Sequence, residues 1–265
     1  QKSKGVVEET TFIESLPFQQ HDLKLGALVA TADPRDSNFK KILKMHNQAS
    51  PHFRGIRKMA SFHEDKGIYA WADEPHLYRN KKFLKGFELL AQYNLSFDAW
   101  TYSTQLSDVI ALAKQFPETS IVLDHLGTPA GLFGAVGKHT GLTKTARENI
   151  FFHWQEDIAE LATLPNVYTK MSGLMMPVLG HHFHLKHQLA SKEQVFDLVH
   201  PLITHALQSF GRYRVMFASN FPMDSVSSSL VNIIDAFSDV VAAYDPDALE
   251  QVLRQNATQF YRMKS

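Results

Sequence analysis

Short apolar segments alternate with longer amphipathic segments along this chain, and this alternation restricts the possible folds more than any other feature. The apolar segments lie at 25–30, 53–57, 95–100, 121–125, 166–173 and 215–217. Between and after them, apolar residues recur at the helical period over about 37–50, 81–93, 106–116, 150–161, 191–211, 230–237 and 245–261. Strand–helix repeats of this kind build a parallel sheet covered by helices, and their number favours a (β/α)8 TIM barrel over a doubly wound sheet.

A closed barrel of this type has eight strands, whereas six can be counted in this sequence. The deficit lies at the N-terminus, because a helix predicted at 7–18 precedes the first clear strand. We therefore expect an N-terminally incomplete barrel, with the first one or two strands absent from this chain.

Ser37 is predicted to cap the helix that follows it. Ser191 and Gln194 form a capping-box pattern, and Pro201 is expected to disturb the helix that they begin.

The composition is that of an ordinary globular chain and excludes several classes of protein. At 265 residues, we expect one domain over residues 1–265. The formal net charge is zero, so nothing favours a nucleic acid as a partner. Without cysteine there are no disulfides or thiolate metal sites, and no apolar run approaches the ~20 residues of a membrane span. We expect a cytoplasmic protein that acts on a small molecule and binds neither membrane nor nucleic acid; a homo-oligomer remains open.

The segment 215–224, VMFASNFPMD, has the pattern of a buried strand that leads into a turn carrying Asp224. Asn220 and Pro222 end the strand pattern at the point where a loop must begin. A carboxylate just past the carboxyl end of a parallel strand lies where α/β barrels place their chemistry. The alternative is an aspartate that stabilises the turn or caps a helix before Ser225.

Five segments, each at a predicted strand, carry distinctive patterns: RGIR at 54–57, LSFD at 95–98, VLDHLGTP at 122–129, KMSGL at 170–174 and FASNFPMD at 217–224. In this order they resemble the amidohydrolase-related family, which includes sugar lactonases and 2-pyrone-4,6-dicarboxylate lactonases. The resemblance extends over almost the whole chain. It implies a TIM-barrel hydrolase.

The resemblance also implies roles for individual residues. Asp224 matches the carboxylate of the family's eighth strand, the general base that activates water, and is expected to be ionised at neutral pH. His125 matches the histidine that binds metal or polarises the scissile carbonyl, and Arg57 matches an arginine that anchors substrate. Lys170 and Ser172 lie two apart on one strand and are expected to line the barrel mouth. Their alternative is an interior ion pair or a packed layer of the barrel.

Two departures from the family pattern concern metal and substrate. The family's first strand ends in His-x-His, but the only such triplet here is His182-Phe183-His184, far downstream. A divalent metal, zinc or manganese, would then keep only His125 and Asp224 as ligands, and the expectation is one such metal or none. Trp100 stands where the family has glutamine. It is expected to form an apolar or stacking wall of the substrate site, or else to be a core aromatic.

We therefore expect hydrolysis of a small lactone, or a related ester or amide, of the sugar-lactone or pyrone-dicarboxylate type. Asp224 would take a proton from the attacking water and return it to the leaving alkoxide. Asp124, next to His125 but on the opposite face of its strand, is expected to be structural. Two alternatives remain: a metal-dependent decarboxylase of the same superfamily, and a catalytically inactive barrel that binds a sugar acid or a partner protein. The histidine-rich stretch 181–187 is expected to lie in a loop, either solvated or beside the substrate pocket.

Overall fold

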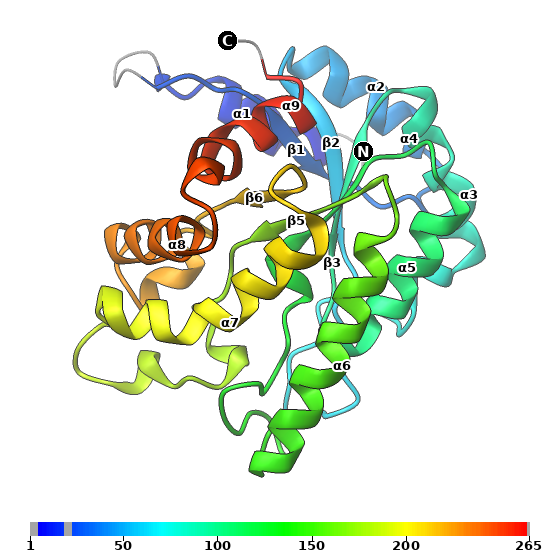
Figure 1. The fold of residues 1–265 in the computed structure, drawn as a ribbon. Coiled ribbons are helices and arrows are strands. Elements are labelled where there is room, and N and C mark those ends of the chain that lie inside the picture. Colours follow the sequence, from blue (N-terminus) through cyan, green and yellow to red (C-terminus); the bar gives the residue numbers. More distant parts are fainter. Residues whose placement is uncertain (1–4, 19–22, 264–265) are drawn as a thin grey trace.

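The computed structural model describes residues 5–18 and 23–263, which contain six strands in one parallel sheet. The strands are β1 (Leu28–Thr31), β2 (Phe53–Met59), β3 (Ser96–Trp100), β4 (Ile121–Leu123), β5 (Val167–Met171) and β6 (Val215–Phe217). Each strand pairs with the next one in chain order, as strands do in a (β/α)8 barrel. The predicted α/β class and its parallel sheet are confirmed (Figure 1).

Helices join the strands and pack around the outside of the sheet (Figure 1). They are α1 (Glu8–Glu14), α2 (Phe39–Ala49), α3 (Lys81–Phe87), α4 (Leu89–Gln92), α5 (Leu106–Gln115), α6 (Lys144–Ala162), α7 (Lys192–Phe210), α8 (Leu230–Tyr244) and α9 (Asn256–Phe260). The predicted capping box is present at the start of α7, where the side chains of Ser191 and Gln194 each accept a hydrogen bond from the other residue's backbone N–H.

The start of α2 and the course of α7 differ from the predictions. Ser37 does not cap α2, which begins after Asn38, because the Asp36 side chain accepts a hydrogen bond from the Asn38 N–H and forms the turn itself. α7 continues through Pro201 without interruption. Buried residues on both sides of this proline hold the helix in the core, and this packing outweighs the local preference for a break.

Two other predicted helices are interrupted. The segment 81–93 is divided at Glu88 into α3 and α4. Gly86, a weak helix former, lies just before this division. The segment 245–261 begins with a 3₁₀ turn at Pro246–Ala248, and a π-helical turn at Gln251–Gln255 precedes α9. Helical periodicity therefore located these segments correctly but not their internal breaks.

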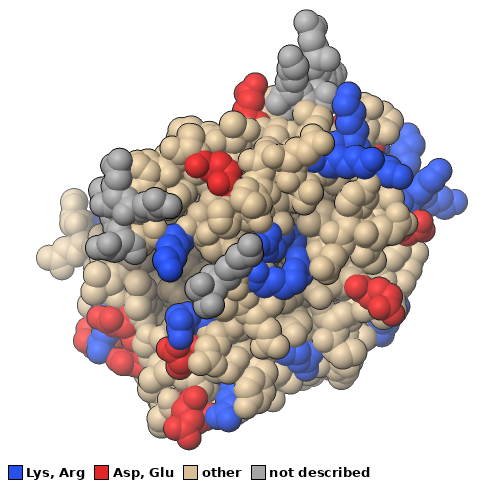
Figure 2. All heavy atoms as spheres, turned by 90° about the horizontal axis from the view of Figure 1, so that it is seen from above, with Lys and Arg blue, Asp and Glu red and all other residues tan. Residues whose placement is uncertain are grey.

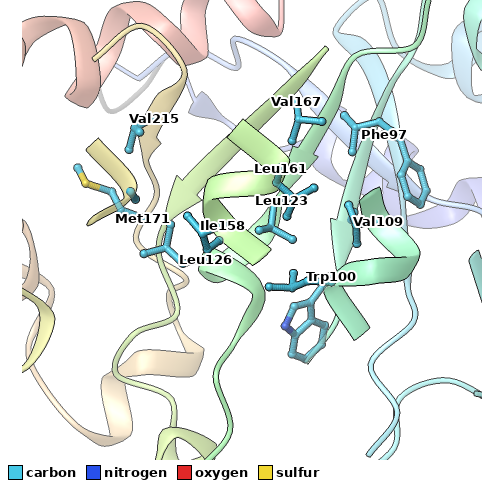
Figure 3. Close-up of a cluster of buried hydrophobic side chains, with 14 of the residues drawn as sticks. Phe97, Trp100, Val109, Leu123, Leu126, Ile158, Leu161, Val167, Met171 and Val215 are labelled. Carbon is cyan, nitrogen blue, oxygen red and sulfur yellow. The ribbon is translucent and has the colours of Figure 1, made fainter. Parts of the chain in front are cut away.

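The main hydrophobic core lies between the outer face of the sheet and the helices. Leu123 of β4 and Val167 of β5 lie in one cluster with Ile158 and Leu161 of α6, and all four side chains are fully buried. Trp100 lies at one end of the labelled part of this cluster (Figure 3). The core thus fixes β3, β4 and β5 against α6. Asp98, Asp124, His125, Lys170 and Ser172, which are discussed below, lie on these strands or directly after them.

A second, smaller cluster fills the inner face of the sheet. Val122 and Met216 point inward and pack against Phe260 and Tyr261, which follow the last strand by some distance in the chain. The side-chain amide of Asn256 donates to the carbonyl oxygen of Val215 at 2.6 Å. The segment around α9 therefore closes the inside of the curved sheet and satisfies part of the edge of β6.

The surface carries charges of both signs. Figure 2 shows Lys and Arg side chains and Asp and Glu side chains scattered over one face, with uncharged surface between them, in keeping with a net charge of zero. Within the part of the chain that the structure describes, every helix is too short or too polar to cross a membrane.

Candidate active site

A cavity of about 720 Å³ opens beyond the carboxyl ends of the strands, the end at which barrel enzymes hold their substrates. Three predicted site residues line it: Arg57 from β2, Trp100 from β3 and His125, which follows β4. Most of the remaining wall is apolar or aromatic and includes Met59, Ile68, Tyr69, Trp71, Tyr102, Val136, Met176, Val178, Leu185 and Met223. A ligand in this cavity therefore meets few polar side chains. Arg57 and His125 lie at the strand ends, whereas Asn220, His182 and His184 lie on loops.

Arg57 is held in place by an acid and an aromatic ring. Its Nε lies 3.2 Å from Oδ2 of Asp124, and its guanidinium lies over the indole of Trp100, 5.3 Å from the ring centre. Burial alone raises the pKa of Asp124, but Lys170 and Arg57 lower it below its ordinary value. Asp124 is therefore a carboxylate that orients Arg57, in keeping with the structural role expected for it.

Lys170 lies beneath the cavity rather than on its wall. Its Nζ is 2.5 Å from Oδ2 of Asp98 and 3.0 Å from Oδ1 of Asp124, and the hydroxyl of Tyr261 donates to the same Asp98 carboxylate at 2.9 Å. Burial lowers the pKa of Lys170, but the two aspartates raise it well above its ordinary value. This is the interior ion pair that the sequence left open as the alternative to a residue of the barrel mouth.

His125 lies in a tight turn that follows directly after β4. The strand ends at Leu123, two residues before the predicted end, and His125 has a left-handed backbone conformation with φ of 57°. Its Nδ1 is 2.8 Å from Oγ of Ser172, and the ring meets Trp100 edge to face. Burial lowers the pKa of His125 to about 4, so the ring is neutral at neutral pH. Ser172 thus contacts His125 and is not part of the cavity wall.

Gly173 keeps the space that the His125 ring occupies. Its φ is +62°, and a Cβ atom added there would lie 2.6 Å from Cγ of His125. Both the backbone conformation and the close approach require glycine. In the KMSGL segment, therefore, Ser172 shares a hydrogen bond with His125 and Gly173 leaves the space for its ring.

Asp224 is fully buried and lies behind the cavity wall. Its Oδ1 accepts from the side-chain amide of Asn220 at 2.7 Å, and its Oδ2 accepts from the Met175 N–H at 3.2 Å. Burial raises its pKa to about 7, although the two hydrogen bonds lower it. The sequence predicted an ionised carboxyl, whereas at this pKa only part of the population is ionised at neutral pH, because the cost of desolvation exceeds the gain from these two bonds. Asn220 lines the cavity and separates Asp224 from it.

The residues present do not fit the divalent metal that the sequence resemblance implies. Over residues 5–18 and 23–263, no three His, Asp or Glu side chains lie together in a way that could hold an ion. Nδ1 of His125 is engaged with Ser172, and both oxygens of Asp224 accept hydrogen bonds within the protein. His182 and His184 line the cavity on the far loop, where they complete no such group.

Two long loops form the rim of the cavity, and a buried aspartate ties them together. Asp65 accepts hydrogen bonds from the backbone N–H groups of Gly67, Lys138, His139 and Thr140. Burial raises the pKa of Asp65, but these backbone bonds lower it well below its ordinary value. The carboxylate therefore holds the loop after β2 against the loop after β4.

The sequence analysis did not identify three rim residues, namely Asp65, Tyr69 and Trp71. They lie in the long connection between β2 and α3, which has neither strand nor helix periodicity. The available signal was the length of this loop itself, since long structureless connections in compact domains are commonly functional. An exposed tyrosine and tryptophan in such a loop would have strengthened the inference.

Comparisons with known proteins agree with this architecture. A family model described as amidohydrolase matches residues 18–263. The uncharacterized protein y4mH of Sinorhizobium fredii is 30% identical over 96% of this chain and 75% of its own length. An L-fucono-1,5-lactonase of Burkholderia ambifaria is 25% identical over 98% of this chain and 82% of its own length. A crystal structure of an amidohydrolase from Burkholderia multivorans with bound zinc superimposes with a TM-score of 0.75 at 20% identity, covering 97% of this chain and 80% of that one. This last likeness concerns the fold, which is the predicted barrel type.

Proposed function

The chain belongs to the amidohydrolase family and is a hydrolase, and on that premise we propose that it opens a small lactone, or a related ester or amide, by water attack on the carbonyl. One observation carries the proposal: Arg57 and the neutral His125 line a single cavity at the strand ends, and the Asp224 carboxyl lies behind Asn220, which lines the same cavity. The lactonase name of a relative that covers nearly the whole chain supports the same reaction class.

In this proposal Arg57 binds the negatively polarised end of the substrate. Asp124 and Trp100 fix the guanidinium on two sides, so little conformational freedom is lost when a ligand binds. Over the described residues, the Arg57 side chain makes an ion pair but no hydrogen bond. Its forked N–H groups are therefore free to pair with a carboxylate or a ring oxygen.

His125 polarises the carbonyl. If the Ser172 hydroxyl donates to Nδ1, the ring proton is on Nε2, and Nε2 can donate to the carbonyl oxygen. This hydrogen bond strengthens as negative charge develops on that oxygen. The low pKa of His125 keeps the ring in the neutral form that this role requires.

Asp224 is the general base. Its pKa of about 7 suits proton transfer near neutral pH, where a base is most effective. The Asn220 amide must first turn away so that Oδ1 faces the cavity. The carboxylate then takes a proton from water as the new C–O bond forms, and it returns that proton to the alkoxide when the lactone C–O bond breaks.

Two variants test this mechanism against a panel of lactones in a pH-indicator assay. Asp224→Asn should lower kcat by at least about 100-fold, which is the rate enhancement that a general base usually provides, while the variant still folds. Asp235→Asn, which changes an exposed carboxylate on α8, should keep wild-type turnover. Retained turnover in Asp224→Asn would exclude the proposed base. Release of carbon dioxide from an aromatic acid, without lactone hydrolysis, would instead favour the decarboxylase alternative.

A further inference from the structure

Two aromatic side chains stand exposed at the rim of the cavity. Tyr69 is 69% exposed and Trp71 is 44% exposed, and both line the cavity. Their rings pack edge to face with centres 4.8 Å apart. Exposed aromatics of this size at a ligand cavity offer apolar area that no other described side chain covers.

The backbone that carries these rings is fixed. The Tyr102 hydroxyl donates to the Tyr69 carbonyl at 2.8 Å, and the Trp71 N–H donates to the carbonyl of the buried Ser61 at 2.9 Å. Asp65 anchors the same loop a few residues earlier. The rings are therefore presented in place before a ligand arrives, which lowers the entropic cost of binding to them.

A row of rings connects the rim to the proposed reactive groups. Trp71 lies 5.6 Å from Trp100 between ring centres, and Trp100 lies 5.6 Å from His125. The proposed reactive groups lie at the inner end of this row, with Arg57 over Trp100 and His125 edge to face with it. A ligand along the row would meet hydrogen-bonding groups at one end and flat apolar surface at the other.

This arrangement is poorly matched to a bare sugar lactone. Each hydroxyl of a sugar that leaves water needs a hydrogen-bond partner, and an unpaired one costs affinity. Beyond Arg57 and His125 the wall is mostly apolar or aromatic, and its described side chains offer few such partners, namely His182, His184, Asn220 and the Tyr and Trp edges. The volume of about 720 Å³ is in the range that holds a drug-sized ligand.

We propose that Tyr69 and Trp71 form an accessory subsite that binds an aryl or other flat apolar substituent of the substrate, whose carbonyl end lies at Arg57 and His125. The substrate class is then an aryl-substituted lactone or ester. This inference rests on the proposed hydrolase function for the orientation of the ligand, but binding at the subsite requires no turnover.

The test uses a matched pair of unreactive carboxylates, butyrate and 4-phenylbutyrate, which differ by one phenyl ring. Calorimetric titration of the wild type should give a dissociation constant for 4-phenylbutyrate at least about tenfold lower than for butyrate, the value of one good aromatic contact. Trp71→Ala should raise the constant for 4-phenylbutyrate by about tenfold and leave that for butyrate unchanged. Trp71→Phe should restore most of the loss, and Phe152→Ala, which removes a ring 56% exposed on α6, should change neither.

A second arm uses γ-phenyl-γ-butyrolactone and γ-butyrolactone as substrates. Trp71→Ala should raise KM for the phenyl lactone, with kcat within about twofold of the wild type, and leave the unsubstituted lactone unaffected. Equal affinity of the wild type for the two carboxylates, or an unchanged constant for 4-phenylbutyrate in Trp71→Ala, overturns the subsite. Trp71-dependent binding of 4-phenylbutyrate without hydrolysis of any lactone would support the subsite and overturn the proposal of lactone hydrolysis.

Discussion

The buried carboxyl of Asp224 should make the stability of the protein depend on pH, and Asp224→Asn should remove that dependence. Burial raises the pKa of this group from its ordinary 3.8 to about 7 in the folded state. Between these two values the folded state binds a proton that the unfolded state has released. The contribution of Asp224 to the free energy of unfolding therefore decreases as pH rises from about 4 to about 7. Above pH 7 it no longer changes with pH.

The size of this effect follows from the difference between the two pKa values. Each pKa unit is worth about 1.4 kcal/mol, so the full cost above pH 7 is about 4 kcal/mol. Between pH 5 and pH 8, the range in which most proteins can be studied, the linkage relation gives a change of about 2–3 kcal/mol. An asparagine side chain does not titrate, so the variant lacks this contribution. Any constant cost of replacing one oxygen by an amide cancels when the two pH values are compared.

Urea unfolding of both proteins at pH 5, 6, 7 and 8, with a chelator present, measures the effect. The free energy of unfolding of Asp224→Asn, relative to the wild type, should rise by about 2–3 kcal/mol from pH 5 to pH 8. The free energy of unfolding of Asp235→Asn should change with pH in the same way as that of the wild type, because this residue is exposed in both the folded and the unfolded state. Parallel curves for Asp224→Asn and the wild type would refute the reasoning, since the carboxyl would then not titrate near neutral pH.

Two further substitutions test the supports of the site. Gly173→Ala should lower stability by about 1–3 kcal/mol and reduce turnover, because its new Cβ displaces the His125 ring. Gly211→Ala is the control: it strains the backbone at a similar φ, but its new Cβ would have no atom within 4 Å. It should lower stability without loss of turnover. Equal turnover in both variants would contradict the role of Gly173 in making room for His125. Lys170→Met should lower the free energy of unfolding by about 3–5 kcal/mol, because it removes the cation paired with the buried Asp98 and leaves Asp124 with Arg57 alone. Lys192→Met, which breaks the exposed ion pair with Asp239, should change the free energy of unfolding little. An equally small change for Lys170→Met would contradict the contribution of the buried ion network to stability.

The sequence predicted the strand order and the residues that meet at the strand ends, because both follow from local patterns. Apolar runs located all six strands to within a few residues, and the carboxyl ends of neighbouring parallel strands necessarily converge. Arg57, Trp100 and His125 therefore line one cavity as a consequence of topology alone.

The remaining features depend on contacts between distant segments, and no local pattern records them. The ionisation of Asp224 depends on how completely Met175 and its neighbours exclude water. The choice of Lys170 between cavity and interior was decided by Asp98, a residue of another strand. Tyr69 was overlooked because its loop lacks periodicity, and its position is set by a hydrogen bond from Tyr102.

The contact between Tyr261 and Asp98 has a consequence for the order in which a newly made chain becomes functional. These residues are 163 positions apart, and their hydrogen bond supports the ion network that ends at Arg57. A chain still on the ribosome can hold all six strands and every side chain that lines the cavity, yet lack this support. Translation that stops between Asp224 and Tyr261 would therefore yield a protein with an intact set of reactive groups and an unsupported anchor for its substrate.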